Sequence, residues 1–406
     1  MASSNHRILI IGGGSAGIMV AARLRRAGQT DIALIEPSDK HYYQPLWTLV
    51  GGGCAPAAET ERTEASVIPR DVRWIRDGAC EIDPDSRTVA TRGGETIGYD
   101  FLVVAPGIQL DWDKIPGLNE TLGQNGVSSN YRFDLAPKTW EFLKELRGGT
   151  AVFAMPAGPI KCAGAPQKIA YLAAHYWQQL GILKDIHVVL AMPTPAMFAV
   201  REFAEVLTGV AERYGIDVRL ETEMTELDPG SKELTLVNRH GGGEERSTLS
   251  YDVLHAVPPQ SAPDWIKNGP LATKEPTGYV DIDKFTMQHV RWPDVFALGD
   301  AGSSPNSKTG AAIRKQAPVV TANLLAVMDG KEPTAQYDGY ASCPLTTARP
   351  RGGLRPGKML LAEFDYSLTP KPTIPLINTI KERRDMWYLK RYGLSFLYWN
   401  MMLKGR

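Results

Sequence analysis

The sequence predicts an α/β protein whose core contains two blocks of parallel β-sheet. Three observations indicate this fold class: short apolar runs alternate with helical patterns, two such blocks start near residues 6 and 150, and the chain shows no repeat of fixed period. Apolar runs predict strands at 8–11, 32–35, 101–104, 152–154, 187–191, 253–257 and 295–298. Helical periodicity predicts helices at 15–27, 136–146, 166–180, 201–214 and 311–328. Gly-Gly pairs at 93–94 and 241–242 predict the tips of antiparallel hairpins.

Length and composition exclude several classes of protein. A chain of 406 residues suggests two to three domains. Its 45 basic residues balance 45 acidic ones, so no overall charge favours nucleic-acid binding. Four cysteines are too few for a secreted scaffold held by disulfides, and the cysteines and histidines are not spaced as metal ligands. Apolar runs are too short for a membrane-spanning helix, and a multidomain enzyme is the class that remains.

A glycine-rich turn follows the first predicted strand. Gly12, Gly14 and Gly17 have the Gly-x-Gly-x-x-Gly spacing and open an apolar helix. They permit a tight turn, close approach of a pyrophosphate and close helix packing, while the helix N-terminus presents free N–H groups. Glu36 ends the next strand and can accept hydrogen bonds from a ribose diol. With Ser15 as a further candidate, the pattern predicts a dinucleotide site in a Rossmann-like domain.

Residues farther along the chain favour FAD over NAD at this site. The last predicted strand leads into Asp300, whose carboxylate would face the ribityl chain of an extended FAD. Ala105 and Gly107 end another strand and fit the crossover that closes such a domain. Lys308 and Thr309 precede a helix whose positive end would stabilise negative charge on a reduced flavin. These features are typical of the two-domain flavoproteins of the pyridine nucleotide–disulfide oxidoreductase superfamily.

The pattern divides the chain into three parts. Residues 1–112 and 280–340 are expected to form a discontinuous FAD-binding domain, because the strand at 295–298 would return to the first sheet. Residues 113–279 would form a second Rossmann-like domain without a nucleotide fingerprint. Residues 341–406, rich in Pro, aromatic and basic residues, would form a C-terminal region.

The second block lacks the glycine turn that a second dinucleotide would need. After strand 152–154 the chain reads Met-Pro-Ala-Gly-Pro-Ile-Lys-Cys-Ala-Gly-Ala-Pro, so we infer that nicotinamide is not the reductant. Cys162 stands in this turn, a few residues before Pro166, which suits the start of a helix. Lys161 and Lys168 flank the thiol, and together with the helix N-terminus they predict a lowered pKa for Cys162.

Cys343 is far from Cys162 in the sequence, and the sequence alone does not establish that the two thiols meet. Structural roles are expected for the remaining cysteines and for three histidines that could act as acids or bases: Cys54, Cys80, His41, His175 and His255.

Five segments, spread over almost the whole chain, carry a family resemblance. They read His-Tyr-Tyr-Gln-Pro-Leu-Trp-Thr-Leu-Val (41–50), Lys-Cys-Ala-Gly-Ala-Pro-Gln-Lys (161–168), Tyr-Asp-Gly-Tyr (337–340) with Ser-Cys-Pro-Leu (342–345), Leu-Ala-Glu-Phe-Asp-Tyr (361–366) and Phe-Leu-Tyr-Trp-Asn-Met-Met (396–402). They resemble the sulfide:quinone oxidoreductases, in particular the subgroup that includes the mitochondrial enzymes.

The resemblance implies noncovalent FAD in the first domain, with Cys162 and Cys343 as the redox-active pair and Pro45 along the isoalloxazine ring. It implies that hydrosulfide attacks a Cys162–Cys343 disulfide, or a sulfur-bridged form of it, and leaves sulfane sulfur on Cys343. A small acceptor such as sulfite or glutathione would take that sulfur, and ubiquinone or menaquinone would take the electrons. The chain departs from three-cysteine bacterial members, since no cysteine lies between Cys80 and Cys162.

Three other functions compete with this one. A type II NADH:quinone oxidoreductase shares the fold, but it predicts a second glycine fingerprint and no cysteine pair. A coenzyme A disulfide or persulfide reductase would also need NAD(P)H. A flavin-bearing redox sensor that uses Cys162 as its switch predicts slow or absent turnover with quinone.

The tail at residues 386–403 combines aromatic with basic residues. This mixture is typical of a segment lying in a bilayer interface, with aromatic rings at headgroup depth and basic side chains reaching outward. A subunit contact, as in a homodimer, or a lid on the core is the alternative. Because the apolar run at 8–11 is too short for a signal peptide, we expect a peripheral or monotopic protein on the cytoplasmic face of a bacterial inner membrane.

Overall fold

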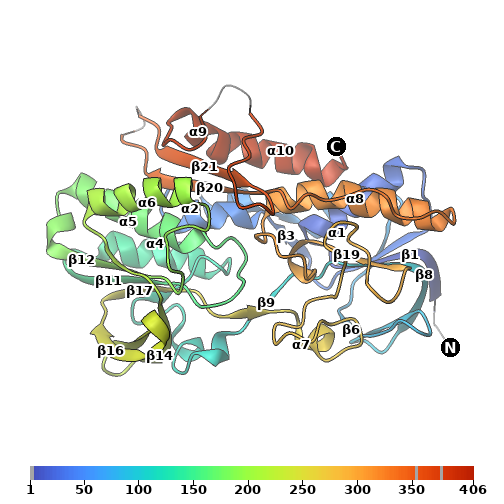
Figure 1. Ribbon diagram of the computed structural model, residues 1–406, viewed down its shortest axis with the longest axis horizontal. Coiled ribbons are helices and arrows are strands. Elements are labelled where there is room, and N and C mark those ends of the chain that lie inside the picture. The colour runs from blue at the N-terminus through green and yellow to red at the C-terminus, as the bar shows by residue number, and fades with distance from the viewer. Residues whose placement is uncertain (1–3, 353–354, 375–377) are drawn as a thin grey trace.

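The computed structural model describes residues 4–352, 355–374 and 378–406 (Figure 1). The fold is α/β, with two parallel sheets lying side by side and the C-terminal segment along one side of both. No helix in these ranges is long and apolar enough to cross a membrane.

The first sheet has the strand order β5-β2-β1-β8-β7-β6, and β19 also pairs with β8. Neighbouring pairs among β5, β2, β1, β8 and β19 are parallel, whereas β6 and β7 form an antiparallel extension. The pairing of Val295 with Leu102 confirms that the chain returns to its first sheet after the second block. The strands of this sheet are β1 (Ser4–Ile11), β2 (Ile32–Ile35), β5 (Arg73–Ile75), β6 (Ala79–Asp83), β7 (Thr88–Thr91), β8 (Thr96–Val104) and β19 (Val295–Ala297).

The second sheet has the order β10-β17-β11-β12-β13, with every neighbouring pair parallel. Because strand side chains alternate between faces, Phe153 of β11 enters the core shared with the helices, and Val152 enters the core shared with an antiparallel β14-β15-β16 sheet. The strands are β10 (Val127–Ser128), β11 (Gly149–Ala154), β12 (Ile186–Ala191), β13 (Asp217–Arg219), β14 (Thr222–Asp228), β15 (Glu233–Asn238), β16 (Glu245–Ser250) and β17 (Val253–Ala256).

The predicted helices form close to their expected bounds. In Figure 1, α4, α5 and α6 lie on one side of the second sheet, opposite β14 and β16. The five helices are α1 (Ser15–Arg26), α4 (Leu135–Glu145), α5 (Ala165–Leu180), α6 (Arg201–Tyr214) and α8 (Gly310–Met328). Shorter elements connect them: β3 (Lys40–Tyr42), α2 (Trp47–Gly51), β4 (Glu61–Thr63), α3 (Glu64–Val67), β9 (Gln109–Leu110), β18 (Gln260–Ser261) and α7 (Asp264–Lys267).

Both hairpin predictions are confirmed. Gly94 has φ +90° in the turn between antiparallel strands β7 and β8, and Gly242 has φ +81° between β15 and β16. Left-handed backbone of this kind favours glycine.

The C-terminal region packs against both halves of the molecule. An antiparallel hairpin of β20 (Ala341–Ala348) and β21 (Lys358–Phe364) places Cys343 in the core around α5. The tail follows as α9 (Asp385–Tyr388), the π-helical turn η8 (Leu389–Gly393) and α10 (Leu394–Asn400). Trp399 and Leu403 of this tail lie in the core of the first sheet. Figure 1 shows α9 and α10 crossing the top of the molecule above α8 and β20.

The carboxyl end of β11 reaches the first domain. The turn that follows β11 pairs with the segment before α8, where the Cys162 N–H donates to the Lys308 carbonyl oxygen at 2.9 Å. Ligand sites in parallel sheets form outside the carboxyl ends of the strands. The fold therefore brings two such edges together.

Candidate active site

The turn after β1 has the geometry of a phosphate cradle. Gly12 has φ +102°, and a Cβ there would lie 2.3 Å from the Ala105 carbonyl oxygen. A Cβ on Gly17 would lie 1.9 Å from the Gly12 carbonyl oxygen, so only glycine permits this packing of α1 on the turn. Apart from the adjacent backbone, no atom of the described residues lies within 4 Å of a Cβ built on Gly14. That open space beside the N-terminus of α1 fits a pyrophosphate.

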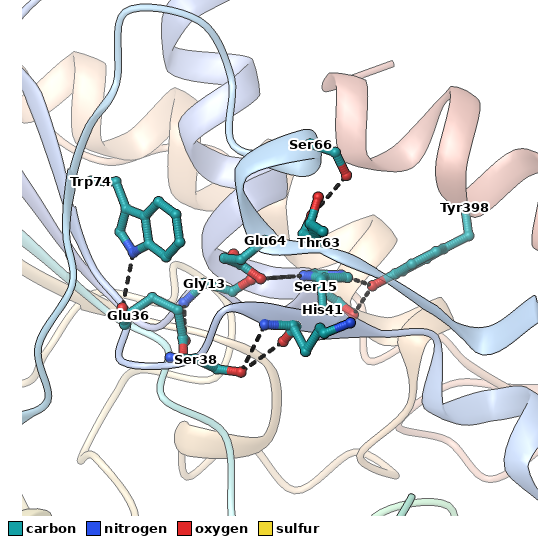
Figure 2. Close-up of polar contacts among 11 residues, drawn as sticks. Gly13, Ser15, Glu36, Ser38, His41, Thr63, Glu64, Ser66, Trp74 and Tyr398 are labelled. Carbon is teal, nitrogen blue, oxygen red and sulfur yellow. Dashed lines mark hydrogen bonds and ion pairs between the residues drawn. The ribbon is translucent and has the colours of Figure 1, made fainter. Parts of the chain in front are cut away.

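Glu36 lies beside this cradle at the end of β2. Its Oε2 accepts from the Gly13 N–H and its Oε1 from the Ser38 N–H, each at 2.7 Å (Figure 2). Burial raises the pKa of this carboxyl. Because each carboxylate oxygen has a second lone pair, the carboxylate could still accept from a ribose hydroxyl.

Asp300 follows β19, close to the turn after β11. No hydrogen bond to its carboxylate is present among the residues that the structure describes, and burial raises its pKa against the opposing charges of Lys308 and Lys161. An unpaired carboxylate at this position fits the polyol chain of a flavin. Ala105 and Gly107 lie at the end of β8, between β1 and β19, as the predicted crossover requires.

Lys308 contacts the loop after β19, and its role toward a reduced flavin stays a prediction. Its Nζ donates to the carbonyl oxygens of Asp300 and Gly302, both at 2.9 Å, and burial lowers its pKa to about 8. The ammonium therefore fixes the loop after β19 instead of pointing freely toward a cofactor. Thr309 caps α8, since its side chain accepts from the Ala312 N–H at 3.2 Å.

Cys162 adopts a strained backbone conformation. Its φ is +52°, a region that non-glycine residues rarely occupy. Three hydrogen bonds hold it there: its N–H donates to Lys308, and its carbonyl accepts from the Tyr131 hydroxyl at 3.1 Å and from the Ala165 N–H at 2.8 Å. Strain that is fixed in this way is common at functional sites.

The two distant thiols meet. Cys162 Sγ and Cys343 Sγ lie 3.8 Å apart, and Lys168 Nζ lies 3.0 Å from the first sulfur and 3.8 Å from the second. A hydrogen bond from Cys343 and the charge of Lys168 hold the pKa of Cys162 well below its usual range, although burial opposes this. The same hydrogen bond and burial raise the pKa of Cys343. Both shifts favour a negative charge on Cys162 over one on Cys343.

Gly164 makes room for this pair. A Cβ at Gly164 would lie 2.7 Å from Cys343 Sγ. Lys161, by contrast, contributes less than the sequence suggests, because its Nζ donates to Gln44 Oε1 at 2.8 Å instead of to the thiol. No backbone N–H of α5 donates to Cys162 Sγ in the described part of the chain, so Lys168 supplies the stabilising charge that we expected from the helix N-terminus.

Lys390 is a site residue that sequence reasoning missed. It is buried, its Nζ donates to the Pro45 carbonyl oxygen at 2.7 Å, and burial and the charge of Lys168 lower its pKa to about 7. It belongs to the π-helical turn η8, whose extra residue turns this side chain inward. Pro45 itself is exposed, between the tail and the Cys162 turn. No periodic signal in the sequence marks a π-helical turn.

Tyr398 of α10 was also missed. Its hydroxyl lies 2.6 Å from His41 Nε2 and 2.7 Å from Ser15 Oγ, and Figure 2 shows it reaching the turn after β1. His41 Nδ1 lies 3.2 Å from Glu64 Oε2, and Glu64 Oε1 is buried without a partner. The side chain of Ser15, a candidate for the dinucleotide site, is therefore hydrogen-bonded to the tail.

The tail does not extend its basic side chains outward as expected. Lys390 points inward, and Arg391 pairs with Glu59 at 2.6 Å. The Pro45 carbonyl oxygen binds Lys390, and the Glu59 carboxylate binds Arg391. The opposite face of the tail is exposed and mostly aromatic or apolar, and it comprises Tyr388, Tyr392, Phe396, Leu397 and Met401, here called the tail stripe.

The remaining cysteines and histidines make structural contacts. Burial raises the pKa of Cys54 to about 11, and the Cys80 thiol donates to the Ala90 carbonyl oxygen. His255 accepts from the Asn130 N–H, and burial lowers its pKa to about 3. His175 accepts from the Arg349 N–H. No group of three or more potential metal ligands is present within the described ranges.

Comparison with known proteins identifies relatives over the whole chain. Residues 6–317 match the family model described as pyridine nucleotide-disulphide oxidoreductase. The chain is 40% identical over 403 residues to the mitochondrial sulfide:quinone oxidoreductase of Dictyostelium discoideum, covering 98% of this chain and 86% of that protein. It is 38% identical to the mouse (Mus musculus) counterpart, covering 100% and 88%. The crystal structure of the sulfide:quinone oxidoreductase from Aquifex aeolicus shares the fold, with a TM-score of 0.80, 19% identity, and coverage of 99% and 92%.

Proposed function

Because this chain belongs to the pyridine nucleotide-disulphide oxidoreductase family and, within it, to the sulfide:quinone oxidoreductases, we propose that it oxidises sulfide through Cys162 and Cys343 and passes the electrons through FAD to a quinone. One observation carries the proposal: two thiols 181 residues apart in sequence lie 3.8 Å apart beside a buried lysine. No structural role requires a thiolate in a buried site.

The sulfur step uses the asymmetry of the pair. In the oxidised protein, hydrosulfide attacks Cys343 Sγ, the Cys162–Cys343 bond breaks, and Cys162 leaves as a thiolate. This direction is favoured because the group with the lower pKa is the better leaving group. Lys168 stabilises the negative charge that forms on Cys162. Cys343 then holds a persulfide, and a nucleophile such as sulfite or glutathione removes the outer sulfur.

The cradle after β1 would hold the pyrophosphate of FAD, with Glu36 at the adenosine ribose and Asp300 at the ribityl chain. Pro45 would lie along the isoalloxazine ring, and the N-terminus of α8 at Thr309 would face it. FAD supplies the chemistry that the side chains lack, since it accepts two electrons as the disulfide re-forms and donates them to quinone. No cradle of this kind follows β11, where Pro156 and Pro159 occupy the turn.

The tail stripe would bring the quinone to the flavin. Its exposed aromatic rings would lie at a membrane surface, where quinones with apolar tails are concentrated. The opposite face carries Lys390, whose Nζ contacts the Pro45 carbonyl oxygen. Only the tail itself would therefore lie between a membrane at the tail stripe and the proposed flavin ring at Pro45.

The test is an anaerobic titration of the FAD-loaded protein. We expect sulfide to bleach the flavin absorbance, NADH to leave it unchanged, and a short-chain quinone to restore it. Bleaching by NADH would overturn the proposal in favour of a type II NADH:quinone oxidoreductase. Bleaching by sulfide without recovery in quinone would favour a redox sensor.

A further inference from the structure

A strongly basic pocket lies away from the cysteine pair, between the ends of α5 and α6 and the β20–β21 hairpin. Its volume is about 210 Å³. This is smaller than the roughly 300–1,000 Å³ of sites for drug-sized ligands, so a small group fits better than a whole nucleotide. Its described lining residues include no acid, and its cationic side chains are those of Arg213, Arg349, Arg351, Arg355, Lys358 and Arg384.

Several donors in this pocket have no protein partner. Nη1 of Arg349 is buried and makes no hydrogen bond, while its Nη2 donates to the Gly53 carbonyl oxygen. His175 Nδ1 accepts from the Arg349 N–H, so the proton of the neutral ring is on Nε2, which lines the pocket as a donor. Burial, and after it the charges of the neighbouring arginines, lower the pKa of His175 to about 4. The guanidinium groups of Arg351 and Arg355 have no hydrogen-bond partner among the described residues.

One wall of the pocket is fixed. Arg213 forms two hydrogen bonds with Glu382, at 2.7 and 2.9 Å, and the guanidinium of Arg349 stacks 4.4 Å from the Trp140 ring centroid. Within the described residues, Glu382 is the one carboxylate that pairs with any of these six cations. Planar guanidinium groups in a fixed arrangement match the oxygens of a phosphate.

The pocket adjoins the tail stripe. Arg384, which lines the pocket, directly precedes α9, and Tyr388 lies one helical turn farther along. Tyr388 is 54% exposed and begins the tail stripe. Aromatic side chains lie at headgroup depth in a bilayer, which is also the depth of the lipid phosphates.

We propose that this pocket binds the phosphate of an anionic phospholipid headgroup at the edge of the membrane contact. The proposal goes beyond the sulfide chemistry and rests only on the membrane contact proposed for the tail. The arginines would fix the orientation of the protein on the bilayer. The protein would then be held at two points, the tail stripe and the phosphate bound at one end of it, and could not rotate freely about the tail stripe.

The experiment compares FAD-loaded protein with the variant Arg351→Gln/Arg355→Gln, whose replaced side chains make no hydrogen bond to any residue that the structure describes. The binding partners are vesicles of phosphatidylcholine with and without phosphatidylglycerol. At about fivefold per charge, we expect the variant to bind the phosphatidylglycerol vesicles more than tenfold more weakly than wild type. Binding to pure phosphatidylcholine should be unchanged. Arg351→Lys/Arg355→Lys should restore about half of the loss or more, because the charge remains.

The control Arg26→Gln/Arg70→Gln removes two exposed charges from the first domain. An equal loss in this control, or no loss in the pocket variant, overturns the proposal. Glycerol 3-phosphate tests a soluble source: if it stabilises wild type but not the pocket variant while vesicle binding is equal, the lipid assignment is wrong. Flavin bleaching by sulfide in detergent should be the same in all variants, so failure of the sulfide chemistry would appear there and not in vesicle binding.

Discussion

The turns after β1 and after β11 occupy equivalent positions in two parallel sheets, but each is suited to a different anion. Both contain a residue with positive φ, Gly12 at +102° and Cys162 at +52°. The first turn leaves open space at Gly14, where backbone N–H groups can meet a phosphate. The second turn is filled by a thiol, and its positive charge comes from the Lys168 side chain.

The difference separates the contribution of the fold to anion binding from that of the side chains. A strand–turn–helix unit at the carboxyl end of a parallel sheet favours negative charge in either domain. Glycines leave space for a charge that a ligand brings, whereas Cys162 and Lys168 supply the negative and positive charges from the chain itself. One architecture thus provides both the proposed cofactor site and the proposed redox site.

The largest effect is expected from the second turn. Cys162→Ser removes the sulfur that leaves as a thiolate when hydrosulfide opens the disulfide, so flavin bleaching by sulfide should fall by about a thousandfold or more. Cys343→Ser should behave in nearly the same way, because neither sulfur can form the disulfide alone. Stopped-flow absorbance of the FAD-loaded protein measures the rate. Cys80→Ser, which alters a thiol bonded only to the Ala90 carbonyl oxygen, is the control; a wild-type rate in either active-site variant would contradict the two-thiol scheme.

The first turn should respond to a methyl group where the second does not. In Gly17→Ala the added Cβ would lie 1.9 Å from the Gly12 carbonyl oxygen, so the turn must move and flavin should be lost. Gly158→Ala adds the same atom in the turn after β11, where no atom lies within 4 Å, and should cost about 1 kcal/mol of backbone strain. The ratio of flavin to protein absorbance distinguishes them. Full flavin content in Gly17→Ala would contradict the proposal that the turn after β1, and not the turn after β11, holds the cofactor.

The charge on the second turn can be tested by pH. Because the pKa of Cys162 is well below 9, wild-type alkylation should stay fast as the pH falls from 9 to 7. Lys168→Gln removes the cation, raises that pKa, and should slow alkylation at pH 7 by about tenfold for each unit of pKa change. Mass spectrometry of iodoacetamide-treated reduced protein measures the rate at Cys162. Lys161→Gln should change the pH profile of alkylation much less, because the Lys161 ammonium donates to Gln44. An equal effect of the two variants would mean that Lys168 is not the main source of the positive charge at Cys162.

The smallest effect concerns the link between the tail and the first turn. Tyr398→Phe removes the hydrogen bonds to Ser15 and His41 and should lower the free energy of unfolding by about 1–2 kcal/mol. Tyr392→Phe, on the exposed face, should change it by less than about 0.5 kcal/mol. Urea unfolding followed by fluorescence provides both values. Equal values for the two variants would mean that the tail is not anchored through Tyr398.

The strands and helices were predictable because their periodicities are strong and local. Predicted strand 8–11 lies within β1, and the prediction at 201–214 matches α6 residue for residue. Cys162 was also predictable, since a cysteine in place of a glycine turn is a local signal. The β20–β21 hairpin was not predicted, because Pro344 interrupts the first of its strands.

Contacts between distant segments could not be read from the sequence. The approach of Cys343 to Cys162 depends on how the β20–β21 hairpin packs on α5. No local sequence pattern predicts this packing. Lys390 was read as an outward cation because an aromatic and basic tail usually faces solvent or lipid. The π-helical turn reverses its direction, and burial against Pro45 then sets its pKa.

The long separation between the two cysteines links reactivity to the completion of folding. While a ribosome is still synthesising the hairpin, Cys162 has neither Cys343 nor an ordered Lys168 beside it, and its thiol titrates as in any peptide. Only the finished tertiary structure turns it into a reactive sulfur. The lowered pKa of Cys162 therefore arises only after the β20–β21 hairpin has packed on α5.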